Sequence, residues 1–198
     1  MKVAERRPYR MRARAEAAER LSADIVDAAF ELWLEKPYDE ITLQEVADRS
    51  EVSLSTVMRR FGSKEGLLET IIKTYKLDEV ALRDSVAAGD VDAALRILSD
   101  GYERLGDAVM RNIALEERFP AVAEWVELGR EYHREWIGRV FAQWLPASGH
   151  RDYRRRRAQF IVATDLYTWK ILRRDQGLSK PETRRAMREL VDRLIEER

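Results

Sequence analysis

The apolar residues of this chain recur every three or four positions almost throughout, which is the period of an amphipathic helix. Near the N-terminus one such series predicts a first helix that ends before Pro37, with apolar positions at Leu21, Ile25, Ala28, Ala29 and Leu32. Further along, long amphipathic stretches predict helices over roughly 90–118, 121–145, 152–175 and 180–197. No segment alternates apolar and polar residues for long enough to indicate a strand, so the sequence predicts an all-α fold.

Capping signals mark the starts of the shorter helices. Thr42-Leu43-Gln44-Glu45 is a capping box, in which each end satisfies a free backbone amide of the other. A third helix is predicted to open at Ser53 and to end before Gly62, and Ser63 is the N-cap of a fourth. The last helix is preceded by a second capping box, Ser179-Lys180-Pro181-Glu182.

The stretch 41–68, ITLQEVADRSEVSLSTVMRRFGSKEGLL, has the features of a helix-turn-helix. Two short helices that cross steeply need a small residue at the crossing, and Ala47 lies in the middle of the first helix. The tight turn between them is predicted at Ser50-Glu51-Val52. The inward-facing apolar positions have the required spacing: Leu43, Val46, Val52 and Val57.

The second of these helices is predicted to present short hydrogen-bonding groups and two guanidinium groups outward, without a carboxylate: Leu54, Ser55, Thr56, Arg59 and Arg60. This composition suits a helix that begins at Ser53, enters the DNA major groove and meets base edges and phosphates. The structural alternative is a helical hairpin in which one face happens to lack acids.

Charge is distributed unevenly, although the 36 basic and 36 acidic side chains balance. Residues 1–20 carry seven Lys or Arg and three Glu, a net charge of +4, and residues 52–64 carry three bases and no acid. Two basic segments near one end allow a neutral protein to bind a polyanion locally. We interpret residues 1–20 as a basic arm that follows a DNA groove or backbone between Arg6 and Arg14. A solvated, disordered tail is the alternative.

A longer series of motifs gives the helix-turn-helix a family resemblance: Ala28-Ala29, Ile41-Thr42, Val46-Ala47, Val52-Ser53, Thr56-Val57, Phe61 and Ser63-Lys64-Glu65-Gly66-Leu67-Leu68. Through them the segment from about Ser22 to Ile72 resembles the DNA-binding domain of the TetR family of bacterial transcriptional regulators. The resemblance implies phosphate contacts from Thr42 and Lys64. It also implies a group of residues that face the bases: Gln44, Leu54, Ser55, Thr56 and Arg59.

Three positions depart from the family pattern. Glu51 stands where the turn usually has glycine, and a positive φ there would cost about 1 kcal/mol. Met58 replaces the common tyrosine of the second helix and cannot donate a hydrogen bond. Arg59 follows in place of an aromatic residue or histidine and adds a donor fork suited to guanine or phosphate. Together these departures predict an altered operator preference.

Aromatic residues are concentrated in the C-terminal two thirds, where 11 of the 17 lie after residue 76. One helical stripe combines rings with small or apolar residues: Trp125, Gly129, Tyr132, Trp136, Val140 and Trp144. Core packing explains such a stripe, and so does an apolar pocket with a few polar groups. The family resemblance implies such a ligand pocket, and its aromatic residues predict a largely apolar or aromatic effector. Its predicted lining is Tyr102, Asn112, Trp125, Tyr132, His133, Trp136, Asp165 and Trp169.

The last two predicted helices each have a wide apolar face. The resemblance implies that they pair with their twofold mates in a four-helix bundle, as a homodimer. The predicted interface residues are Leu166, Met187, Leu190, Val191 and Leu194. Packing within the chain alone is the alternative.

Several classes of function are disfavoured by what the sequence lacks. No apolar run approaches the roughly 18–20 residues of a transmembrane helix, and the basic N-terminus has no apolar core of a signal peptide. We therefore expect a cytoplasmic protein. The chain has no cysteine, and it lacks the GxGxxG, P-loop and HExxH motifs. We expect no catalytic residues, no metal site and no cofactor.

Taken together, these features predict a ligand-released repressor that binds double-stranded operator DNA as a homodimer. The expected organisation is a basic arm over 1–20, a three-helix helix-turn-helix domain over 21–72, and a helical ligand-binding and dimerisation domain over 73–198. A helical ligand-binding or scaffold protein without operator binding is the alternative, and binding to operator DNA distinguishes the two.

Overall fold

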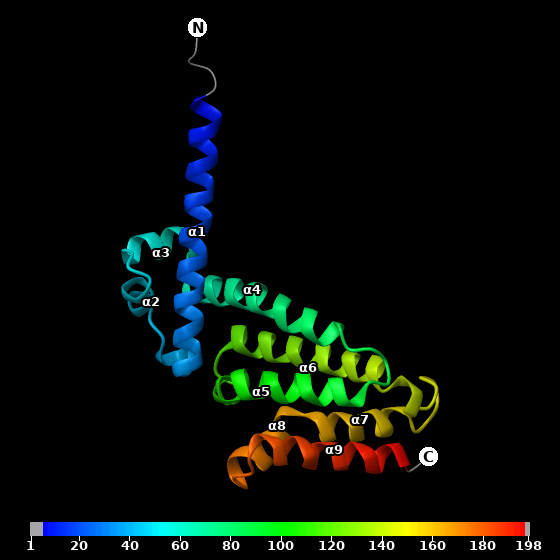
Figure 1. Cartoon of the computed structure of the whole chain (residues 1–198). Helices are drawn as coiled ribbons and strands as arrows, with labels where there is room; N and C mark the ends of the chain where they lie inside the picture. The colour runs from blue at the N-terminus through cyan, green and yellow to red at the C-terminus, as the bar shows by residue number, and fades with distance from the viewer. Residues whose placement is uncertain (1–5, 197–198) are drawn as a thin grey trace. The chain divides into compact units, whose positions relative to one another are not determined.

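The structure, a computed structural model, describes residues 6–196, and every regular element in that range is helical (Figure 1). The all-α prediction is confirmed for these residues. The chain forms two compact units, Met1–Tyr75 and Lys76–Arg198. The boundary falls inside helix α4 (Lys64–Asp84), so this helix contributes to both units.

The N-terminal unit is built from three helices, a short 3₁₀ turn and the first half of α4: α1 (Arg6–Glu35), η1 (Tyr38–Glu40), α2 (Leu43–Arg49) and α3 (Leu54–Phe61). α2 packs on α3 and on α1. At the crossing of α2 and α3, Ala47 is completely buried together with Val46 and Val57, as predicted. Leu43 and Val52, the other two predicted inward positions, are half-buried.

Helix α1 begins at Arg6, whereas the sequence predicted a first helix starting near Leu21. Residues 11–20 are alanine, arginine, glutamate and methionine, all strong helix formers. Arg12 and Glu16 add an ion pair of 3.3 Å one turn apart. Pro8 lies in the first turn, where its missing N–H removes no helical hydrogen bond. The described part of the predicted arm is therefore helical, and residues 1–5 of that arm lie outside the described residues.

The turn between α2 and α3 contains a positive φ at Glu51, the position where the family pattern usually has glycine. Glu51 has a φ of 56°, a left-handed conformation that is unfavourable for a residue with a Cβ. The turn is closed by a hydrogen bond in which the Val52 amide donates to the Ala47 carbonyl at 2.9 Å. Glu51 is exposed, so the conformation is imposed by the backbone of the turn.

Replacing Glu51 with glycine is expected to stabilise the N-terminal unit by about 1 kcal/mol, because glycine adopts positive φ without a steric penalty. The midpoint of urea unfolding should rise for Glu51→Gly and fall for the β-branched control Glu51→Val. A midpoint that stays level or falls for Glu51→Gly would show that the turn relieves its strain in another way.

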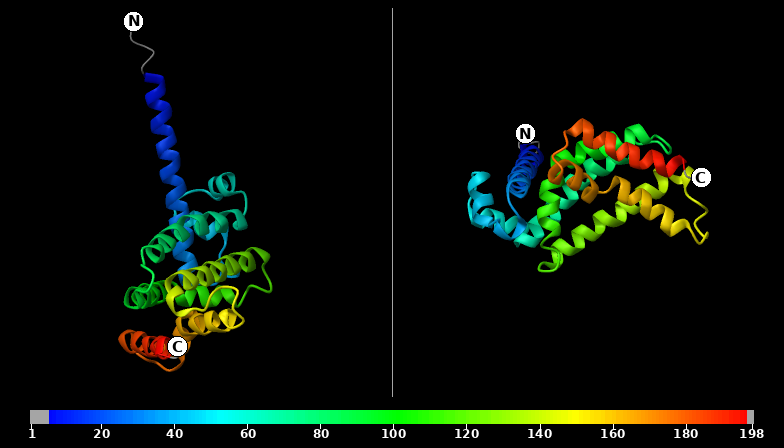
Figure 2. Two further views of the ribbon diagram at one scale, coloured as in Figure 1. Left: turned by 90° about the vertical axis from the view of Figure 1, so that its right-hand side faces the viewer. Right: turned by 90° about the horizontal axis from the view of Figure 1, so that it is seen from below.

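The C-terminal unit holds the rest of α4 and the later elements: α5 (Val91–Ile113), α6 (Pro120–Val140), η2 (Ala142–Trp144), α7 (Tyr153–Thr164), α8 (Leu166–Lys170), η3 (Ile171–Asp175) and α9 (Lys180–Glu196). Helix α9 packs on α5 and α7, and α6 packs on the same two helices (Figures 1 and 2). The capping box predicted ahead of α9 is present: the Ser179 amide donates to Glu182 at 2.8 Å, and the Glu182 amide donates to the Ser179 hydroxyl at 3.4 Å.

The helix predicted over 152–175 is interrupted at Asp165, whose backbone is extended with φ −75° and ψ 155°. Its carboxylate accepts the Tyr167 amide at 2.9 Å and so caps a new helix, α8. A π-helical turn, η3, follows directly. The interruption lies in the core, between the buried side chains of Thr164 and Leu166.

Large rings fill the core of this unit, and Gly106 makes room for one of them. Trp136, Phe141, Phe160 and Trp169 are almost completely buried. A Cβ on Gly106 would lie 2.5 Å from the ring of Trp169, which only a glycine avoids. None of the helices described between residues 6 and 196 combines the length and the apolar character of a membrane-spanning segment.

Candidate DNA-binding and effector sites

Helix α3 buries Val57 on its inner face, and its exposed side carries polar side chains beside Leu54 and Met58. Ser53 caps its start, since the Thr56 amide donates to the Ser53 hydroxyl at 3.3 Å. Val57 is buried, whereas Ser55 and Arg59 are exposed. Arg59 forms no hydrogen bond or ion pair with any residue that the structure describes. Its guanidinium group is therefore available to a partner outside the chain.

The remaining predicted residues of this helix do not all face outward. Leu54 is 38% exposed and Thr56 is half-buried. Arg60 was predicted to point outward, but its guanidinium donates to the Ala18 carbonyl at 2.9 Å and to the Ser22 hydroxyl at 2.5 Å. The prediction that Arg60 points outward is wrong, because Arg60 lies on the side of α3 that faces α1.

Thr42 occupies the start of α2 in the predicted capping box. The Glu45 amide donates to the Thr42 hydroxyl at 3.2 Å, and the Thr42 amide donates to the Glu45 carboxylate at 2.9 Å. Hydrogen bonds from Lys36 and from Thr42 lower the pKa of Glu45 to about 2. Gln44 is exposed next to the cap, and its amide donates to Asp48 on the same helix at 2.7 Å.

Lys64 is held in place at the start of α4. Its ammonium group lies 4.2 Å from the centre of the Tyr38 ring, a cation–π distance, and its pKa is lowered by burial. The Tyr38 hydroxyl donates to Glu65 at 3.2 Å. Burial and the neighbouring Glu65 charge raise the pKa of Tyr38 to about 12. A half-buried lysine held against an aromatic ring loses less side-chain conformational entropy when it binds an anion than a fully exposed lysine does.

This arrangement matches a known family. A model of the family "Bacterial regulatory proteins, tetR family" matches residues 25–71, which hold α2, α3 and the parts of α1 and α4 that pack on them. The crystal structure of a TetR transcription regulator from Haloarcula marismortui, 18% identical, shares the fold with a TM-score of 0.66 over 88% of this chain and 97% of that one. The segment 25–71 is thus similar to the DNA-binding domain of the TetR family of transcriptional regulators.

Two HTH-type transcriptional regulators have sequences similar to this chain. The HTH-type transcriptional repressor Rv3405c of Mycobacterium tuberculosis is 30% identical over 129 residues, which cover 61% of this chain and 64% of the repressor. The HTH-type transcriptional regulator YvkB of Bacillus subtilis is 37% identical over 51 residues, covering 26% of this chain and 27% of that regulator. The matched segments thus span less than two thirds of these relatives.

In the C-terminal unit, five of the eight predicted effector residues gather around Arg83 of α4, a residue that the sequence analysis did not select. They are Tyr102, Tyr132, His133, Trp136 and Asp165. Nothing in the spacing of the α4 sequence marks Arg83, because its neighbours in the cluster come from helices far along the chain. The one feature of the sequence that could have drawn attention to Arg83 is an arginine among the apolar positions of a helix.

A chain of hydrogen bonds organises this cluster. Arg83 approaches Nδ1 of His133 at 3.5 Å, and Nε2 of His133 lies 3.3 Å from the Thr164 hydroxyl. The Thr164 hydroxyl donates to the Phe160 carbonyl at 2.8 Å. These partners fit a neutral imidazole that accepts at Nδ1 and donates from Nε2. The Tyr102 hydroxyl donates to the Thr164 carbonyl at 2.9 Å.

The other three predicted effector residues have separate surroundings. Trp169 is buried 6.0 Å from the Tyr102 ring, and its indole N–H donates to Glu103 at 3.0 Å. Asn112 is buried and donates to the Ala108 carbonyl at 2.8 Å. Trp125 is half-buried on α6. The buried indoles and phenol therefore have the hydrogen-bond partners that burial requires.

Stability at mildly acidic pH is expected to depend on His133. Burial and the nearby Arg83 lower the pKa of His133 to about 3, whereas an unfolded histidine has a pKa near 6.5. The unfolded state thus binds the extra proton first, and stability falls as pH drops from 6.5 toward 3. Between pH 7 and pH 5 the loss should be about 2 kcal/mol.

Urea unfolding of the wild type and of His133→Gln at both pH values measures this contribution, since other titrating groups affect both proteins. The wild type should lose about 2 kcal/mol more than the variant between pH 7 and pH 5. Equal losses would mean that the imidazole is protonated in the folded protein.

The predicted dimer residues divide between the core and the surface. Leu166, Met187 and Val191 are buried in the chain's own core, because they lie on the sides of α8 and α9 that face it. Leu194 is half-buried at the edge of that core. Leu190, in contrast, is 46% exposed. Leu166, Met187 and Val191 therefore pack within the chain, which is the alternative to the predicted dimer interface.

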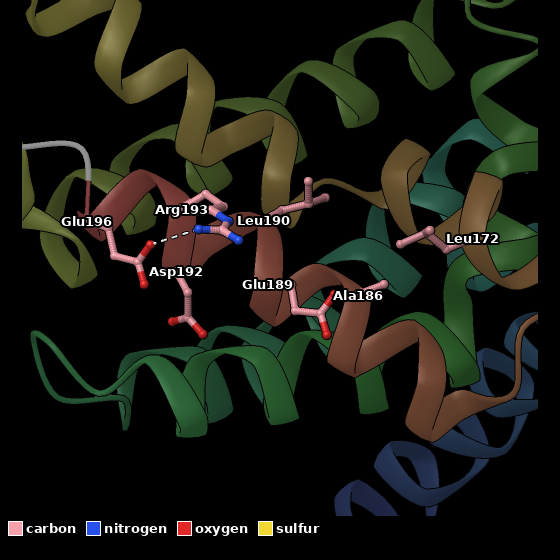
Figure 3. Close-up of a pocket in the computed structure, with 7 residues that line it drawn as sticks. All are labelled: Leu172, Ala186, Glu189, Leu190, Asp192, Arg193 and Glu196. Atoms are coloured by element: carbon pink, nitrogen blue, oxygen red, sulfur yellow. Dashed lines mark hydrogen bonds and ion pairs between the residues drawn. The ribbon is translucent and has the colours of Figure 1, made fainter.

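Leu190 lines a surface groove of about 520 Å³ (Figure 3). Leu172 of η3 and Ala186 of α9 add apolar surface, and Arg193 and Glu196 form an ion pair of 3.2 Å near the C-terminal end. Other large apolar side chains are exposed on the same run of helices, namely Val162, Tyr167 and Ile171. The last helices thus present apolar surface that the chain itself leaves uncovered.

Proposed function

We propose that this chain is a homodimeric repressor that binds operator DNA through α3 and releases it when an effector binds the C-terminal unit. The observation that carries the proposal is the outer face of α3, where Ser55 and Arg59 are exposed opposite the buried Val57 and no carboxylate is present. A helix with this face meets the negative charge of DNA without repulsion and offers donors to base edges. The match of residues 25–71 to the model of the TetR family supports a regulatory role.

The residues of the proposed DNA interface have different roles. Arg59 contacts guanine or phosphate with its free donor fork. Thr42 and Lys64, at the starts of α2 and α4, contact phosphates, where a helix N-terminus also favours negative charge. Arg60 joins α3 to α1 and so fixes the angle of the reading helix. The exposed Arg14 on the N-terminal part of α1 adds backbone contacts flanking the site.

The proposed dimer brings two copies of the uncovered apolar surface together. Ile171, Leu172 and Leu190 would be buried against the same residues of the second copy, as a twofold interface requires. Two α3 helices are then placed on successive turns of one face of the DNA. An effector that binds more tightly when these helices are wrongly spaced weakens DNA binding by linkage. We place this activity in the cytoplasm.

Selection from a random pool of duplex DNA by the full-length chain tests the proposal without knowledge of the operator. The enriched sequences should contain two inverted half-sites whose centres lie about one helical turn apart. A pool that shows no enriched sequence, at a salt concentration where the protein still retains DNA, would favour the alternative of a helical protein without operator binding.

A further inference from the structure

Arg83 is a half-buried arginine that has no acidic partner among the described residues. Two other half-buried arginines of the C-terminal unit are paired: Arg173 with Glu103 at 2.9 Å, and Arg134 with Glu127 at 2.7 Å. No carboxylate lies within ion-pair distance of Arg83 among the residues that the structure describes. Asp165, the acid of the same cluster, instead accepts the Tyr167 amide at 2.9 Å. A partly desolvated cation without a counter-charge is a costly arrangement, which a folded protein retains when the charge has a use.

Three aromatic rings surround this cation. The guanidinium carbon lies 6.0 Å from the centre of the Tyr102 ring, 5.8 Å from Tyr132 and 5.9 Å from Trp136. These cation–π distances partly stabilise the charge. Rings cannot neutralise it, however. Trp136 and Tyr102 are buried, whereas the half-buried Tyr132 leaves part of an aromatic ring exposed beside the charge. The surroundings of Arg83 thus combine one positive charge with aromatic surface.

The groups beside Arg83 do not compete for an anion. His133 accepts from Arg83 and is kept neutral by burial, so it carries no second positive charge. Arg139 is already bound to Asp84 at 2.7 Å. The cluster also lies at the break between α7 and α8, where the freed Thr164 carbonyl accepts from Tyr102. Polar groups from several helices that converge on one place in an apolar core are typical of a binding site.

We propose that Arg83 is the anion-binding residue of the effector site and that the effector is a monocarboxylate with an aromatic or apolar body. This inference rests on the proposed function, in which the C-terminal unit binds an effector. A carboxylate matches the two parallel donors of one guanidinium group and cancels its single charge. A phosphate dianion would need further donors or a second free cation, and the described residues of the cluster offer neither.

The test uses a library of aromatic and aliphatic monocarboxylates, each paired with its primary amide, which has the same shape without the charge. Thermal unfolding of the full-length chain identifies compounds that bind, and calorimetry gives their Kd. Acids should raise the unfolding temperature and their amides should not. In Arg83→Gln the Kd of those acids should rise at least about tenfold, as expected for loss of a charge-assisted pair. Arg83→Lys keeps the charge but loses the two parallel donors of the guanidinium group. Its Kd for the acids should lie between those of the wild type and of Arg83→Gln.

Controls separate this inference from the proposed function. Arg96→Gln, an exposed arginine on α5, should bind the acids as the wild type does. Amides that bind as well as acids, or acids that bind Arg83→Gln unchanged, would overturn the role of Arg83 while leaving effector binding intact. If no acid and no amide of the library binds, the inference is overturned, and the result also counts against effector binding. DNA binding is measured separately, by selection from the duplex pool.

Discussion

Replacing Arg59 with alanine is expected to weaken binding of the selected DNA by about 1–3 kcal/mol for each subunit. A dimer on two half-sites loses the contact twice, so the total loss is about 2–6 kcal/mol if the half-sites act independently. Arg59 is exposed and has no partner among the described residues, and folding should therefore be unaffected. Fluorescence anisotropy with labelled duplex, at one fixed salt concentration, gives the two affinities.

Two other arginines serve as controls for this substitution. Arg96→Ala removes another exposed arginine, on α5, and should leave DNA binding unchanged. Arg60→Ala removes the hydrogen bonds to Ala18 and Ser22 of α1 and should lower the unfolding temperature, which Arg59→Ala should not do. An Arg59→Ala protein that binds the selected duplex as tightly as the wild type would remove Arg59 from the interface.

Replacing Leu190 with glutamate is expected to raise the dimer dissociation constant at least about 100-fold, because the change places two unpaired carboxylates in one interface. Leu190 is 46% exposed, so the folded single chain accommodates the charge. Sedimentation equilibrium at micromolar concentration should show a dimer for the wild type and a monomer for Leu190→Glu. Affinity for the selected duplex should fall with it, since the two half-sites are then bound by separate chains.

Leu128→Glu is the matched control, because Leu128 is a similarly exposed leucine, 40%, on α6. This variant should remain dimeric and bind DNA normally. Leu194 is unsuitable for the test because it packs at the edge of the chain's own core, where a charge would disturb folding. A Leu190→Glu protein that stays dimeric would place the interface on another surface.

The features that the sequence predicted correctly depend on residues close together in the chain. The capping boxes at Thr42 and Ser179 need only a side chain and an amide three residues apart. The tight turn at Ser50-Glu51-Val52 needs only the residues between two short helices. Ala47 at the helix crossing is set by the same short segment. Local geometry of this kind can be read from a motif.

The features that the sequence did not predict depend on contacts between distant segments. Arg60 turns toward Ala18, 42 residues away, and is lost from the outer face. Arg83 acquires its aromatic surroundings from α5 and α6, so no pattern within α4 reveals it. Met187 and Leu190 lie on the same amphipathic helix, and only the packing of α9 shows which one is covered. Helical periodicity identifies an apolar face but does not identify the neighbour that buries it.

The claim that α3 reads DNA sequence is tested most directly by combining protein and DNA substitutions. Affinities of the wild type and of Arg59→Ala would be measured on the selected duplex and on duplexes in which each base pair of a half-site is changed in turn. The account predicts that at one position the wild type discriminates by about 1–3 kcal/mol, whereas Arg59→Ala discriminates by less than about 0.5 kcal/mol. Identical discrimination by both proteins at every position would contradict it.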